Sequence, residues 1–159
     1  MNALLLAMLL SQAAEATAAP PPEFRLNVGG QVGFPFLAGA KATGTFFANG
    51  RPRFDVNTTW ELSASLQSYS VGGAYHLVDR WFFIGPRLRL VTYQPPWARG
   101  VVVPFFGLGL DLGADLRVGP RDKGVITIAL HGTYVPAQAT NLQWILGLSA
   151  GFSWSVFER

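Results

Sequence analysis

The chain has 159 residues, enough for one domain, and half of these residues are hydrophobic while only 13% are charged. It has no cysteine, which excludes disulfides, thiol catalysis and attachment of a lipid through cysteine. The net charge of +3 is not gathered into basic runs with interleaved aromatic residues, so nucleic acid is not expected as a partner.

The first 18 residues are predicted to be a signal peptide. Their apolar run, Ala3 to Leu10, is too short to cross a bilayer as a helix, which takes about 20 residues. A small-x-small cleavage site follows at Ala16-Thr17-Ala18. We therefore expect the chain to be exported, with residues 19–159 forming the mature domain.

Almost all of the remaining sequence alternates between apolar and polar residues, which is the pattern of strands with two different faces. In residues 105–118, FFGLGLDLGADLRV, one face is formed by residues such as Leu108, Leu110 and Leu112. The other face carries glycines and three charged residues. In chain order, strands are expected at residues 25–34, within 36–50, and at 53–67, 68–77, 81–93, 105–118, 125–134 and 142–157.

The expected connections fall into two classes. Short polar turns are predicted at Asn49-Gly50, at Asp79-Arg80 and at residues 119–124. Residues 94–100 and 136–141 are predicted to form larger loops, and the loop after the first strand is expected to be longer still. Alternation of the two classes along an up-and-down chain is typical of a barrel with short turns at one end.

Two kinds of antiparallel barrel use this alternation. In a soluble lipocalin-like barrel the apolar face points inward to hold a ligand, whereas in an outer-membrane barrel it faces lipid and the polar face lines the interior. The polar face here is dominated by glycine and serine, although a water-facing surface is normally rich in lysine and glutamate. The sequence therefore favours an all-β, eight-stranded antiparallel transmembrane barrel, with a secreted carrier of a hydrophobic ligand as the alternative.

Aromatic residues are expected to mark the two membrane interfaces. Trp144 and Trp154 share a face ten residues apart. On a tilted strand this spacing corresponds to about 25 Å along the membrane normal, the height of the apolar band of such barrels. The predicted interface aromatics are Tyr75, Trp81, Tyr93, Trp97, Tyr134, Trp144 and Trp154.

The closing segment carries the most specific pattern. Residues 149–156, Ser-Ala-Gly-Phe-Ser-Trp-Ser-Val, match a polar, any, glycine, any, any, aromatic, any, apolar ending, and Phe157 follows. In this ending the chain resembles small outer-membrane β-barrels of the type of the transmembrane domain of outer-membrane protein A. The resemblance implies the outer membrane of a Gram-negative bacterium, with membrane lipid and lipopolysaccharide as partners. It also implies that the barrel-insertion machinery reads this last strand.

If the polar face is interior, its charges must pair, because an unpaired charge in a narrow barrel is costly. Arg87 and Asp111 are predicted cross-strand partners, and Arg89 could reach Asp111 diagonally. Such a network favours a salt-bridged plug over a charge-selective pore. The predicted interior polar residues are Arg25, Arg53, Asp55, Glu61, Arg87, Arg89, Asp111, Asp115, Arg117 and His131.

The predicted role is structural, or one of surface contact through the loops at residues 94–100 and 136–141. A lipid A-modifying enzyme is a less favoured alternative, because its base would have to be His76 or His131, both expected inside the barrel. A small channel is a second less favoured alternative. Two isolated histidines without cysteine form no recognisable metal site, and no glycine cluster precedes a helix, so no cofactor is expected.

Overall fold

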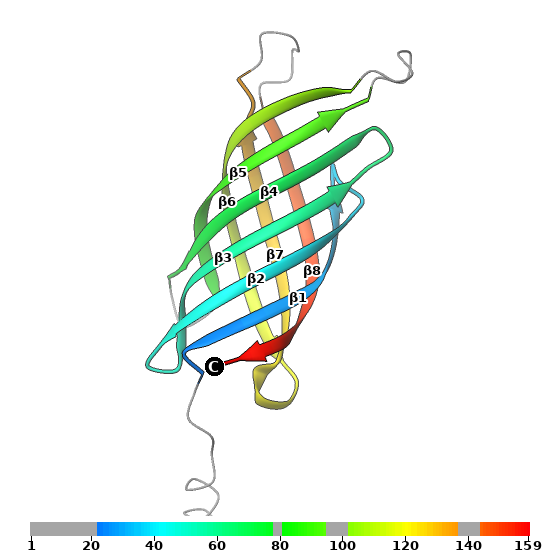
Figure 1. Ribbon diagram of the computed structural model, residues 1–159. Coiled ribbons are helices and arrows are strands. Elements are labelled where there is room, and N and C mark those ends of the chain that lie inside the picture. Colours follow the sequence, from blue (N-terminus) through cyan, green and yellow to red (C-terminus); the bar gives the residue numbers. More distant parts are fainter. Residues whose placement is uncertain (1–21, 78–80, 95–101, 137–143) are drawn as a thin grey trace, which may run out of the picture.

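A computed structural model of the protein describes residues 22–77, 81–94, 102–136 and 144–159. Neighbouring strands are antiparallel, and β1 also pairs with β8, so the sheet closes into a barrel (Figure 1). The predicted eight-stranded antiparallel up-and-down barrel is confirmed. Among the described residues, no helix is long and apolar enough to cross a membrane. The elements are β1 (Phe24–Phe34), β2 (Ala38–Ala48), β3 (Arg51–Leu62), β4 (Leu66–His76), β5 (Phe82–Tyr93), β6 (Val103–Val118), a 3-10 turn (Pro120–Asp122), β7 (Gly124–Tyr134) and β8 (Trp144–Glu158).

The two ends of the barrel differ in what they carry. We call the lower end in Figure 1 the turn end; β2, β4, β6 and β8 end there, and the C-terminus lies there. We call the opposite end the loop end; β1, β3, β5 and β7 end there. The connection after β1 was expected to be long, but it spans only residues 35–37. The strand expected over residues 53–67 is also interrupted, since β3 ends at Leu62 and β4 begins at Leu66.

The alternation of the sequence places the apolar residues outside. On β6, Leu108 and Leu110 have 66% and 53% of their surface exposed, whereas the acidic residues Asp111 and Asp115 have 3% and 6%. The same division recurs around the barrel, where leucine, valine and aromatic side chains cover the outer surface. The lumen is lined mainly by polar side chains because every second residue of each strand points inward.

A β-bulge reverses the predicted orientation of Arg53. On the β2–β3 ladder Phe46 pairs with Phe54, but Phe47 pairs with Pro52, so Arg53 is the extra residue. Pro52 is buried, and Arg53 and Phe54 are both exposed. The prediction that Arg53 belongs to the interior network was therefore wrong, because alternation is lost where two residues of one strand oppose one residue of the next.

The lumen is not polar throughout. At the loop end, the inward positions of several strands carry apolar residues, which pack into one cluster. This apolar cluster consists of the buried Phe36, Val91, Val135 and Ile145 with the partly buried Leu66 and Phe105. A smaller buried cluster of Ala74, Phe83 and Ala129 joins β4, β5 and β7. The apolar cluster therefore forms a cap over the ionic network at the loop end, which we call the apolar cap. The alternation of apolar and polar residues in the sequence did not predict this cap.

The position of Gly113 predicts a destabilising variant. Gly113 pairs with Phe83 across β5 and β6, and a Cβ atom there would lie 2.8 Å from Cε1 of the Phe83 ring and 2.6 Å from the Ile128 carbonyl oxygen. We expect Gly113→Ala to lower the free energy of unfolding by about 1–3 kcal/mol through overpacking. Urea titration of the barrel in detergent micelles, followed by tryptophan fluorescence, measures this change.

Gly132→Ala is the matched control. A Cβ atom at Gly132 would meet only Cδ2 of Leu146, at 3.7 Å. We therefore expect this variant to stay within about 0.5 kcal/mol of the parent protein. Equal stability of the two alanine variants would contradict the tight packing of Phe83 on Gly113.

Candidate functional site

The candidate site is the set of polar side chains inside the barrel. Of the ten residues predicted there, eight are buried: Arg25, Asp55, Glu61, Arg87, Arg89, Asp111, Asp115 and His131. Arg117 is half-buried at the turn end, and Arg53 is outside, as described above. The lumen also buries His76, Gln31 and several serine and threonine residues, which share the parity of the predicted set.

Arg87 and Asp111 form the central ion pair. The Arg87 Nε donates to Asp111 Oδ2 at 2.6 Å, and Arg87 Nη1 donates to Ser70 Oγ at 3.0 Å and to Thr59 Oγ1 at 3.3 Å. The residue directly opposite Arg87 on β6 is Gly109, so the arginine passes over a glycine to reach the carboxylate two residues further along. The predicted pairing of Arg87 with Asp111 is present, in a diagonal arrangement.

Asp111 also contacts His131, its direct neighbour on β7. His131 Nδ1 lies 2.8 Å from Asp111 Oδ1, and His131 Nε2 lies 2.6 Å from Ser149 Oγ on β8. When Nδ1–H donates to the carboxylate, a neutral imidazole accepts the serine proton at Nε2. An acid, a histidine and a serine thus lie in the order that serine hydrolases use. Ser149 was not selected from the sequence, although it is on the polar face of its strand.

A second ion pair joins β3 and β5. Arg89 Nη2 lies 3.1 Å from Glu61 Oε2, and Gln31 Nε2 donates to Glu61 Oε1 at 2.6 Å. The Arg89 guanidinium also lies over the Phe36 ring, 5.2 Å from its centre, and so meets the apolar cap. Arg89 therefore pairs with Glu61, whereas a diagonal contact with Asp111 was the sequence-based expectation.

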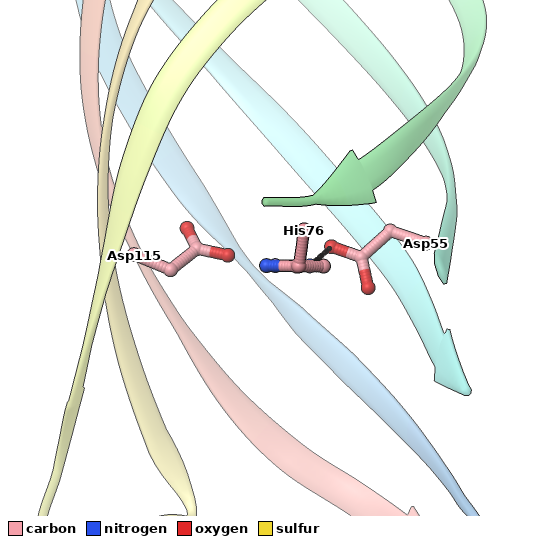
Figure 2. A group of neighbouring side chains, drawn as sticks. All are labelled: Asp55, His76 and Asp115. Carbon is pink, nitrogen blue, oxygen red and sulfur yellow. Dashed lines mark hydrogen bonds and ion pairs between the residues drawn. The ribbon is translucent and has the colours of Figure 1, made fainter. Parts of the chain in front are cut away.

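The lower half of the lumen holds a separate group of acidic residues and one histidine. His76 Nε2 lies 2.9 Å from Asp55 Oδ2, and Thr127 Oγ1 donates to Asp115 Oδ1 at 2.6 Å. Figure 2 shows the imidazole between the two carboxylates. Below them, at the turn end, Arg25 Nε lies 3.1 Å from Glu158 Oε1.

The turn end is further closed by contacts of Arg25. Arg25 Nη1 donates to the Asp122 carbonyl oxygen at 2.6 Å, and Nη2 donates to the Arg121 carbonyl oxygen at 3.2 Å. The guanidinium groups of Arg25 and Arg117 lie 5.4 Å and 5.1 Å from the centre of the Phe47 ring. These contacts tie the 3-10 turn to the lumen side of β1.

Two small cavities lie among these side chains in the described part of the barrel. One is lined by Glu61, Arg89, His131 and Ser149, among others, and the second by Asp55, Asp115, Lys41 and Arg117, among others. Each has a volume of about 10 Å³. A space of this size holds about one water molecule.

The predicted interface aromatics are placed as follows. Trp144 and Trp154 both project outward from β8, Trp144 beside Tyr134 near the loop end and Trp154 beside Gly124 near the turn end. The Tyr134 and Trp144 rings are 5.2 Å apart. The structure also exposes Tyr75 and Trp81 on the outer surface.

Two of the predicted interface aromatics are not seen on the outer surface. Tyr93 continues the inward parity of Arg89 and Val91 and is half-buried, so it does not join the outward aromatics. Trp97 lies outside the described residues. The inward face of β5 therefore carries arginine in the middle of the lumen and a tyrosine at its rim.

Comparison with known proteins identifies the fold. No protein-family model and no curated protein matches the chain. Among solved structures, Neisserial surface protein A is 17% identical over 83% of this chain and 96% of that chain, with a TM-score of 0.52. Ail, the attachment invasion locus protein of Yersinia pestis, is 13% identical over 86% of this chain and 99% of that chain, with a TM-score of 0.44. The chain has the fold of a small eight-stranded barrel, as the resemblance of its closing strand predicted.

The central ion pair generates a stability prediction. Asp111→Ala leaves the Arg87 guanidinium buried without its carboxylate, so we expect the free energy of unfolding to fall by about 3–5 kcal/mol. Urea titration in detergent micelles measures the loss. The double variant Arg87→Met, Asp111→Leu removes both charges and should lie much closer to the parent protein.

The control for this prediction is Glu23→Ala, which removes a carboxylate that is exposed at the turn end. We expect a change within about 0.5 kcal/mol. If Asp111→Ala unfolds at the same urea concentration as Glu23→Ala, the ion pair does not hold the barrel together.

Proposed function

We propose that the chain is an integral outer-membrane barrel of a Gram-negative bacterium, with a plugged interior and a structural or surface-contact role. The observation that carries the proposal is the contrast between the two surfaces of the sheet. Apolar side chains cover the outside, while ion pairs such as Arg87–Asp111 are buried inside. A lipid-facing barrel has this arrangement, because acyl chains solvate apolar side chains and closure pairs every backbone group.

The alternative of a soluble carrier fits these features less well. A lipocalin-like barrel keeps an apolar cavity for its ligand and a polar exterior. Here the middle of the lumen is ionic, and its cavities measure about 10 Å³ each. The large exposed side chains of Leu108, Phe106 and Trp144 would face water in a carrier, at a high cost in solubility.

The same packing favours a plug over a channel. Arg87 spans from Asp111 to Thr59 and Ser70, so side chains of β3, β4, β5 and β6 meet in the middle of the lumen. The apolar cluster around Phe36 and Val91 lies above this layer. An ion would have to break the pairs and displace the cap to pass, which is the opposite of a hydrated pore with weak sites.

An enzymatic role is disfavoured because a substrate could not reach the serine, although the residue types would suit a hydrolase. Asp111, His131 and Ser149 have the order of a catalytic triad, but Ser149 is 7% exposed and its neighbouring cavity has a volume of about 10 Å³. An acyl substrate needs room for its reacting carbonyl within about 3 Å of the serine and of oxyanion donors. We therefore assign these three residues to the structural network.

Membrane lipid and lipopolysaccharide are the proposed partners of the outer surface, and the barrel-insertion machinery is the proposed partner of β8. The similar Neisserial surface protein A is, as its name says, a surface protein, which agrees with surface contact as one role of this chain. The predicted signal peptide at residues 1–18 and most of the two larger loops lie outside the described residues. Export and surface contact through these loops are therefore parts of the proposal that rest on the sequence.

The lipid-facing orientation predicts a strong effect of charge on the outside of β6. Leu110 is exposed at the middle of the strand. We expect Leu110→Arg to cost about 2–4 kcal/mol of stability in lipid bilayers, because a charge at that depth loses its hydration. Folding equilibria in phosphatidylcholine vesicles measure this cost, and cell fractionation shows where the parent protein resides.

Val156→Arg is the matched control, because Val156 is equally exposed but lies near the turn end of β8. Its cost should be about 0–1 kcal/mol. In a soluble carrier Leu110→Arg would be harmless and the parent protein would stay monomeric without detergent. That outcome would reject the membrane proposal.

The buried position of Ser149 predicts that the triad-like arrangement is inert. We expect a fluorophosphonate probe to label the folded parent protein no more than it labels the Ser149→Ala variant, because the probe cannot enter the cavity beside the serine. Labelling is measured by mass spectrometry of the intact chain. Attachment that depends on Ser149 would instead support a hydrolase.

A further inference from the structure

A second group of titratable side chains lies in the turn-end half of the lumen, and the proposed structural role does not use it. Asp55 on β3, His76 at the end of β4 and Asp115 on β6 each offer one ligand atom, and these atoms all lie within 4.8 Å of one another. All three side chains are buried, with 5%, 2% and 6% of their surface exposed. In Figure 2 the imidazole stands between the two carboxylates.

The group has unused bonding capacity. His76 Nδ1 and Asp55 Oδ1 are buried and have no hydrogen-bond partner among the described residues, and His76 has only 2% of its surface exposed. Asp115 is held by Thr127 through one oxygen. Buried polar atoms without a partner are costly, so two such atoms in one small cluster point to a missing ligand.

A cavity adjoins the two carboxylates. It is lined by Asp55 and Asp115 together with Asn27, Thr43 and Lys41, among others, and its volume is about 10 Å³. Within the described part of the chain, the Asn27 Oδ1 and Thr43 Oγ1 atoms at its wall also have no hydrogen-bond partner. The space beside the ligand atoms is therefore sized for one water molecule and bordered by groups that could bind it.

The ligand chemistry selects the kind of ion. One imidazole and two carboxylates are typical ligands of Zn²⁺ and similar divalent transition metals, whereas Mg²⁺ and Ca²⁺ prefer oxygen ligands alone. Three protein ligands and one water also form the usual set of an open Zn²⁺ site. We propose that Asp55, His76 and Asp115 bind a divalent transition-metal ion of the Zn²⁺ class, with water in the adjoining cavity as its fourth ligand.

Binding would exchange existing contacts without any redox step. The hydrogen bond between His76 Nε2 and Asp55 Oδ2 is replaced by bonds of both residues to the metal, and the Nε2 proton moves to Nδ1, so that the imidazole binds as a neutral ligand. The two carboxylates offset the charge of the ion. Because β6 is not a neighbour of β3 or β4, the ion joins strands across the lumen and adds stability to the closed barrel.

Lys41 supplies a sharp test because it lines the same cavity and its ammonium group competes with the metal for the carboxylates. Arg117 also lies at the cavity wall, and its Nε and Nη1 have no hydrogen-bond partner in the part of the chain that the structure describes. Lys41→Met removes the ammonium group of this competitor while keeping a flexible, unbranched side chain that ends one atom earlier. In this proposal the variant binds Zn²⁺ more tightly than the parent protein does.

The experiment uses the whole chain, folded in detergent micelles, dialysed against EDTA and then titrated with Zn²⁺ or Co²⁺. We expect one ion per chain, visible absorption bands of Co²⁺ bound to nitrogen and oxygen ligands, and a rise of the unfolding temperature on addition of Zn²⁺. His76→Gln keeps an amide that can donate to Asp55 but removes the imidazole, so it should lose all three signals.

His131→Gln is the matched control, because it removes the other buried histidine from the central cluster and should still bind one ion. Heat-modifiable migration on gels verifies that each variant is folded. No binding by the parent protein, or equal binding by His76→Gln, would overturn the proposal. If His76→Gln does not fold, Lys41→Met decides: tighter binding supports the site, and unchanged or weaker binding places the ion elsewhere and overturns it.

Discussion

Charged side chains that point into a lumen too narrow to hydrate them are the constraint on which this structure depends. Each such charge needs a partner from another strand, because an isolated buried charge costs far more than the barrel can supply. Arg87 with Asp111 and Arg89 with Glu61 meet this need in the middle of the barrel. Glycines on the same face, such as Gly109 opposite Arg87, leave the space that the long side chains occupy.

The outer surface follows from the same division of each strand into two faces. Its leucine, valine and aromatic side chains need no specific partners in the proposed lipid environment, because acyl chains would solvate all of them alike. Bulges are the places where this division fails. One of them carries Arg53 to the outside, and a second, between Leu26 and Asn27, leaves Val156 and Phe157 both exposed.

The two buried histidines show that access and charge, more than residue type, separate a structural role from a chemical one. Both ring nitrogens of His131 have a partner, Asp111 on one side and Ser149 on the other. The Asp111 carboxylate is in turn neutralised by Arg87. His76 lies between two carboxylates, one of its ring nitrogens has no hydrogen-bond partner among the described residues, and a water-sized cavity adjoins the two carboxylates. The first environment suits packing of the barrel and the second suits a small cation.

Much of this protein could be predicted from residue order alone, because a strand has a period of two whatever surrounds it. That rule placed Leu108 and Leu110 outside and Asp111 inside, and it predicted the closed eight-stranded barrel and the Arg87–Asp111 pair. Only the tertiary structure decided that Arg89 pairs with Glu61, that Phe36 caps the lumen, and that Asp55, His76 and Asp115 meet. These contacts join strands that are not neighbours, and they depend on tilt, stagger and bulges, which the alternation of a single strand does not encode.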